Sequence, residues 1–136
     1  MDASDFRRIT SHPAEFRRVL LVQTDDGPQP LADVADDWQE ADFLALDPGW
    51  QRAIGQTVEG GFQRGYLERA RGHSKTADLA IMAVWALIAS PRPVVGIAVA
   101  ADLDQSRLLR DAIARLANLN EWLGEFIDVK KDEIEN

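Results

Sequence analysis

The sequence lacks cysteine altogether and contains only two histidines, His12 and His73. The first absence excludes disulfides, thiolate nucleophiles and cysteine-based zinc sites, and two isolated histidines do not make a metal site by themselves. Long apolar runs are also missing: the longest, over 79–89, has 11 residues, whereas a membrane-spanning helix needs about 20. The first residues show no apolar stretch of the kind found in signal peptides. We therefore expect a cytoplasmic protein without a membrane segment.

Basic residues are scarce relative to acidic ones. The chain has 15 Lys and Arg against 23 Asp and Glu, a net charge of −8 at pH 7, and residues 1–60 hold most of the acidic excess. Tight, nonspecific nucleic-acid binding needs clustered Lys and Arg, so the overall acidity argues against it for this chain alone. One local positive cluster exists within 12 residues: Arg64, Arg69, Arg71 and Lys75.

Length and apolar content predict one small domain, or a part of a larger one. A hydrophobic fraction of 46% with four tryptophans is enough for a core. Residues 1–34 are polar and are predicted to form an irregular extension with one short helix. Residues 31–46 have the spacing of a helix, in which Asp36-Asp37 offers a second starting point. Asp47-Pro48-Gly49 is expected to end that helix.

From residue 64 onward, strand-like and helix-like segments alternate. The run VVGIAVA is continuously apolar and bounded by turn signals, as is typical of a strand buried on both faces of a parallel sheet. Asp102 followed by Gln105 predicts a capped helix start. The expected elements are strands over 65–68, 94–100 and 126–129, helices over 75–90 and 103–118, and the start of a fourth strand over 132–136.

Strands and helices in this order with short connections imply right-handed crossovers and an α/β fold. The loop between the first strand and the first helix, residues 69–76, reads RARGHSKT. A Lys-Thr pair at a helix entrance after a strand is the core of the phosphate-binding P-loop, in which backbone amides face the phosphates. The usual pattern has glycines where this chain has Arg69 and Ser74. The motif is therefore degenerate, but its place on the first strand-to-helix turn is where such sheets bind phosphates.

Over residues 35–136 the chain resembles the ATPase domain of the large terminase subunit of tailed bacteriophages, the motor that packages DNA into capsids. The similarity is carried by ARGHSKT and by AADLDQ at 100–105. The resemblance implies a RecA-like P-loop NTPase, a three-layer α/β sandwich with an incomplete parallel sheet flanked by helices. It further implies ATP and Mg²⁺ as cofactors, and double-stranded DNA, portal and capsid proteins as partners in a bacterial host cell.

The resemblance also implies roles for individual residues. Lys75 and Arg71 would serve phosphoryl transfer, and Thr76 would bind Mg²⁺. A Trp-Gln motif contacts adenine in the family, and either Gln39 or Gln51 matches it. The phosphate-binding residues would be Ala70, Arg71, Gly72, His73, Ser74, Lys75 and Thr76. Simpler roles are also open: an ordinary helix start for Lys75 and Thr76, solvated loop residues for Arg71 and His73, and packed Trp-Gln pairs for the glutamines.

Terminases continue with an apolar strand ending in Asp-Glu, which this sequence does not show before its last residue. The chain is therefore expected to be the front half of an ATPase domain, from a truncated, split or remnant gene, with a second chain as one possible source of the missing acids. Two alternatives to an ATPase segment are considered. One is a non-catalytic P-loop remnant or nucleotide-binding module, and the other is a small P-loop kinase, which the lack of a visible lid disfavours.

Overall fold

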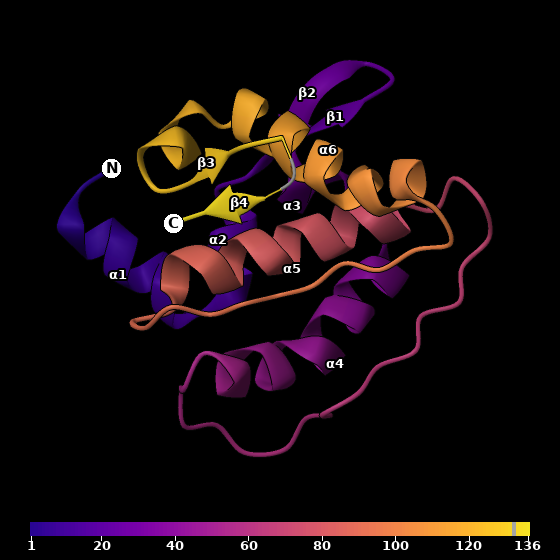
Figure 1. The fold of residues 1–136 in the computed structure, drawn as a ribbon. Helices are drawn as coiled ribbons and strands as arrows, with labels where there is room; N and C mark the ends of the chain where they lie inside the picture. Colours follow the sequence, from indigo (N-terminus) through magenta and orange to yellow (C-terminus); the bar gives the residue numbers. More distant parts are fainter. Residues whose placement is uncertain (132) are drawn as a thin grey trace.

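Helix α5 (Lys75–Ala89) lies at the centre of the fold (Figure 1). The computed structural model describes residues 1–131 and 133–136. α5 contacts α1 (Ala3–Ser11), α2 (Pro13–Arg18), α4 (Asp37–Ala53) and α6 (Leu103–Leu119). The helix predicted over 75–90 is thus confirmed, and these neighbours explain why it can be apolar on several faces. Its buried apolar residues are Ala80, Ile81, Met82, Val84, Trp85, Ala86 and Ile88.

The first 34 residues are ordered, which differs from the irregular extension that the sequence predicted. They form α1, α2, the antiparallel strands β1 (Leu21–Thr24) and β2 (Gly27–Pro30), and the short helix α3 (Leu31–Val34). The indole of Trp85 donates to the carbonyl of Ile9 at 2.9 Å, which ties the end of α1 to α5. The remaining core side chains of this region are Phe16, Leu20 and Leu31.

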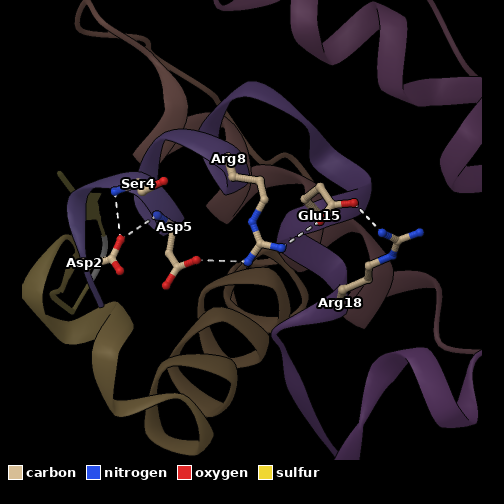
Figure 2. Close-up of polar contacts among 6 residues, drawn as sticks. All are labelled: Asp2, Ser4, Asp5, Arg8, Glu15 and Arg18. Atoms are coloured by element: carbon tan, nitrogen blue, oxygen red, sulfur yellow. Dashed lines mark hydrogen bonds and ion pairs between the residues drawn. The ribbon is translucent and has the colours of Figure 1, made fainter.

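The N-terminus of α1 is capped by Asp2, whose Oδ1 accepts from the amides of Ser4 and Asp5 at 2.8 Å each. Figure 2 shows this cap beside a chain of exposed ion pairs, in which Arg8 contacts both Asp5 and Glu15 at 3.2 Å. The far carboxylate oxygen of Glu15 meets Arg18. These contacts link α1 to α2.

Helix α4 begins after Asp36, which is one of the two starting points that the sequence offered. The prediction that it ends at Asp47-Pro48-Gly49 is wrong. The helix continues to Ala53 with Pro48 inside it. A Cβ on Gly49 would lie 2.6 Å from the carbonyl oxygen of Phe62, and a Cβ on Gly61 would lie 2.7 Å from the Cβ of Pro48. Pro48 and Gly49 therefore pack closely against the backbone of residues 61–62.

Helix α6 confirms the predicted helix over 103–118, together with its cap. Asp102 Oδ1 accepts from the amide of Gln105 at 2.8 Å. Ala112, Ile113 and Leu116 are its buried residues. A short 3₁₀ helix, η1 (Glu121–Glu125), then leads to the antiparallel pair β3 (Asp128–Val129) and β4 (Ile134–Glu135). The predicted fourth strand includes Asp132, which lies outside the described residues.

No parallel sheet occurs in residues 1–131 and 133–136, where the strands form two antiparallel hairpins. The segments 65–68 and 94–100, predicted as strands, have no ladder partner there. A strand exists only with a neighbour to take up its backbone hydrogen bonds, so these two segments remain single traces. Figure 1 shows that they lead into α5 and α6, which begin at the same side of the molecule. No helix of the described chain is both long and apolar enough to span a membrane.

Candidate phosphate-binding loop

Residues 69–77 surround an open hollow of about 400 Å³ at the N-terminus of α5. Two residues in the loop have left-handed backbone, Gly72 with φ 83° and Ser74 with φ 54°. A positive φ suits glycine and is uncommon for serine, so the turn into α5 has an unusual backbone. Left-handed residues next to a helix start turn successive amides in a similar direction, which creates a concavity that favours anions.

The backbone amides of residues 74–77 make no hydrogen bond within the described chain. Their orientation follows from the helix, whose first turn has no preceding carbonyls to accept from it. α5 is 15 residues long, so its dipole adds partial positive charge at this end. The side chains of Arg71 and Lys75 are exposed at the hollow and make no ion pair with any residue the structure describes. Free amides and two cations therefore share one concave surface.

Arg69, the first residue of the loop, is held inward and does not face solvent. Its guanidinium contacts two carboxylates, Nη2 to Asp42 at 2.7 Å and Nη1 to Asp78 at 2.6 Å. It also lies over the ring of Trp38, with Cζ 4.7 Å from the centroid. Burial lowers the pKa of Arg69, but the hydrogen bonds to the two carboxylates outweigh burial and raise it. Arg69 therefore stays charged and attached to α4 and α5.

Asp78 lies below the loop with only 2% of its surface exposed. Its two oxygens accept from Gln39 Nε2, at 3.0 and 3.2 Å, in addition to Arg69. Burial raises the pKa of Asp78, and the hydrogen bonds from Arg69 and Gln39 oppose that rise. Asp78, Arg69, Gln39 and Asp42 thus form one polar cluster between α4 and the loop.

The two glutamines named as candidates for adenine differ in their surroundings. Gln39 is buried, and besides its bonds to Asp78 it accepts from the amide of Asp36 at 3.1 Å through Oε1. Both ends of its amide are occupied, so a base could reach it only by displacing these partners. Gln51 donates to Gln56 at 3.1 Å. It lies 12 residues beyond Gln39 on α4, about 18 Å along the helix axis, and is therefore remote from the loop.

Thr76, the residue expected to bind Mg²⁺, is half-buried in the first turn of α5. Its hydroxyl makes no hydrogen bond to another described residue, and it lines the hollow. Mg²⁺ in nucleotide sites takes most of its ligands from phosphates and water, so one hydroxyl is a suitable protein contribution. In the described parts of the chain, no group of three or more His, Asp or Glu side chains is placed to hold a metal ion by itself.

Residues 70–76 lie together in the structure, as any contiguous loop must. The structure also places Trp38, Asp42 and Asp78 beside this loop. The ring of His73 lies 6.0 Å from that of Trp38, which brings the start of α4 to the loop. The sequence contained one signal of the cluster beneath the loop: beyond Lys75, Asp78 is the only charged residue of the helix. A charge at such a position needs a buried partner.

No protein-family model, curated protein or solved structure matches this chain.

Proposed function

We propose that residues 70–76 bind the phosphates of ATP, as the nucleotide-binding segment of a terminase-like DNA-packaging ATPase. Lys75 and Arg71 neutralise phosphate charge, the free amides of the loop donate to phosphate oxygens, and Thr76 contributes its hydroxyl to Mg²⁺. When bound, Mg²⁺ would supply positive charge that offsets the negative charge of the phosphates. DNA and the portal and capsid proteins are the partners that this proposal implies.

The observation that carries the proposal is the coincidence of three features at one hollow. The helix N-terminus leaves amides unpaired, the left-handed residues Gly72 and Ser74 shape the turn, and Arg71 and Lys75 are exposed without a carboxylate partner among the described residues. Unpaired cations beside free amides bind an anion strongly, because each hydrogen bond is assisted by charge. Any one feature alone would fit an ordinary helix start.

The arrangement of α5 and α6 gives further support. The two helices pack against each other and begin at the same side of the molecule, and the apolar segment 94–100 precedes α6. This is the arrangement of successive strand–helix units, in which phosphate sites lie at the helix N-termini. The ARGHSKT and AADLDQ segments add the resemblance to terminases, and with it the proposed RecA-like P-loop fold.

A second candidate function is a nucleotide-binding module without turnover. Hydrolysis needs a group that orients the attacking water. The two carboxylates that form ion pairs with the loop, Asp42 and Asp78, are both bound to Arg69. Because both are held by Arg69, neither is available to orient a water, and this favours binding over hydrolysis.

The test is equilibrium binding of Mg·ATP, followed by the rate of phosphate release with and without double-stranded DNA. Lys75→Ala is expected to weaken binding about 10- to 100-fold, since a charge-assisted hydrogen bond contributes about 1.5–3 kcal/mol. Lys131→Ala, which removes an exposed lysine elsewhere, serves as the matched control and is expected to bind as the wild type does. Absence of ATP binding by the wild type would refute the proposal, and binding without phosphate release would select the module.

A further inference from the structure

We propose that Asp78 is a positioning residue of the phosphate loop: acting through Arg69, it fixes the loop in its ATP-binding shape. This inference rests on the proposed nucleotide binding. It assigns to the polar cluster around Asp78 a role in the affinity for ATP that is separate from its contribution to folding.

The first step is the position of Asp78 itself. It occupies the fourth residue of α5 and is nearly inaccessible, surrounded by a helix that is otherwise apolar on its buried face. A buried ion pair generally contributes little net stability compared with apolar residues of similar size. Burying a carboxylate here is therefore poorly explained by stability, and its partner Arg69 belongs to the loop.

The second step is the geometry of Arg69. Its side chain is only 7% exposed, with both terminal nitrogens directed to carboxylates. The planar guanidinium is fixed by these two contacts and by the Trp38 ring beneath it. Arg69 stands where the usual P-loop pattern has a glycine, yet its guanidinium is bound to two carboxylates. It therefore serves as an anchor, and the hollow is left to Arg71 and Lys75.

The third step connects the anchor to the loop backbone. Arg69 Nη1 also donates to the carbonyl oxygen of His73 at 3.3 Å, across the turn that contains Gly72. The amide of Asp78 donates to the carbonyl of Ser74 at 2.8 Å. The anchored cluster thus holds the first residue of the loop and the turn before Lys75. Residues that hold a binding loop in place improve affinity by reducing the ordering that the ligand must impose.

The chain contains a matched control for this cluster. Arg17 on α2 makes a two-pronged ion pair with Asp47 on α4, at 2.8 and 2.9 Å, and both residues are buried. Arg17 also lies over an aromatic ring, 4.5 Å from the Phe43 centroid. The pair has the same chemistry as Arg69 with Asp78, but it is part of no loop. Asp47→Asn therefore reproduces the loss of stability without touching the phosphate site.

The experiment measures two quantities for the wild type, Asp78→Asn and Asp47→Asn. The first is the Kd for Mg·ATP, and the second is the rate of limited trypsin cleavage after Arg71 and Lys75 in the absence of nucleotide. We expect Asp78→Asn to raise the Kd about tenfold, a loss typical when the support of a binding group is removed, and to speed cleavage in the loop. Asp47→Asn is expected to lower the unfolding temperature to a similar degree while leaving both quantities at the wild-type level.

Each outcome bears on one claim. If the wild type binds ATP and Asp78→Asn binds it equally well, the positioning role is refuted while the proposed function stands. If both substitutions weaken binding equally, the effect is one of stability and the positioning role is again refuted. If the wild type binds no ATP, the proposed function itself fails. If Asp78→Asn does not fold, Asp42→Asn replaces it. The Asp42 carboxylate is 37% exposed, and its loss releases Arg69 from one side. An unchanged rate of loop cleavage in Asp42→Asn would contradict the role of Arg69 as an anchor.

Discussion

Arg17 and Asp47 show how a single buried pair contributes to the stability of this protein. Their side chains are 5% and 11% exposed, and Glu40 lies 3.6 Å from the same guanidinium. Asp47→Asn is expected to lower the free energy of unfolding by roughly 3 kcal/mol, because it leaves a buried guanidinium without its main partner. Urea denaturation measures the change. The double variant Arg17→Met/Asp47→Leu should recover most of the loss, and a loss below about 1 kcal/mol in the single variant would show that the pair is solvated.

Gly49 is a residue at which the usual effect of a helix substitution is expected to reverse. Replacing an exposed glycine inside a helix by alanine commonly stabilises by up to about 1 kcal/mol. Here the new Cβ would lie 2.6 Å from the carbonyl oxygen of Phe62, so the backbone must move. We expect Gly49→Ala to destabilise, and Gly124→Ala, which meets open space, to be neutral or stabilising. Thermal unfolding of both variants tests this, and a stabilised Gly49→Ala would disprove the close approach.

At the level of helices and strands, α5 and α6 could be predicted because their signals are local: apolar spacing, Asp102 at a cap, and the prolines that follow residue 89. The hairpin of β1 and β2 was missed because Gly27–Pro30 contains two prolines. Both strands are edges of a two-stranded sheet. Since the prolines are two residues apart, their missing N–H groups lie on the same, unpaired side. The continuation of α4 through Pro48 was missed because its contact with Gly61 depends on tertiary packing.

The cap of α1 predicts how this helix responds to acid. Two backbone hydrogen bonds, from Asp5 and then Ser4, lower the pKa of Asp2 from its ordinary 3.8 (Figure 2). The ionised cap therefore stabilises α1 fully above pH 3.8, and this contribution is lost as the pH falls through the lowered pKa of the folded state.

Asp2→Asn keeps a side-chain acceptor for the same two amides but does not titrate. We expect the wild type to exceed Asp2→Asn in stability at neutral pH, because the ionised cap also favours the helix dipole, and we expect that advantage to vanish below the lowered pKa. Urea denaturation of both proteins at neutral and at strongly acidic pH measures the difference. An advantage that does not change with pH would contradict the role of Asp2 charge.

For the molecule as a whole, the largest difference from the sequence-based expectation concerns residues 94–100. The continuous apolar run predicted a strand buried on both faces, whereas Val95, Ile97 and Val99 are 90%, 84% and 86% exposed. Periodicity reports which residues are apolar, but burial also requires neighbouring strands, which the described chain does not supply. The N-terminal region is more packed than its sequence suggested. Although it is polar on average, it packs against the C-terminal part through the stacked rings of Phe6 and Phe126, whose centroids are 4.6 Å apart.

The exposure of this segment predicts tolerance to polar substitution. Val95→Thr and Ile97→Thr are expected to change the free energy of unfolding by less than about 0.5 kcal/mol, as is usual for surface positions. Val84→Thr, on α5 with no exposed surface, should cost more than about 1 kcal/mol because it buries a hydroxyl. Denaturant titration of the three variants compares them directly. A large loss for Val95→Thr would mean that the segment is packed in solution.

The candidate site was predictable only in part. The loop residues are contiguous, so the ARGHSKT motif located Arg71, Lys75 and Thr76 without knowledge of the fold. Asp42 and Gln39, by contrast, meet the loop cluster across separations of 27 and 39 residues. Such contacts depend on how α4 packs against α5, which no local pattern encodes. The sequence therefore indicated the loop surface that we propose binds phosphates, but not the cluster that contacts Arg69 beneath it.

The most direct measurement is a titration of isotopically labelled protein with Mg·ATP, followed by NMR of the backbone amides. If residues 70–76 bind the phosphates, the amides of 72–77 shift first and saturate together, and Lys75→Ala weakens the response while Lys131→Ala leaves it unchanged. Amides near Gln51 or in β3 and β4 should stay in place. An absence of saturable shifts in 72–77, or shifts confined to another surface, would contradict nucleotide binding by this loop.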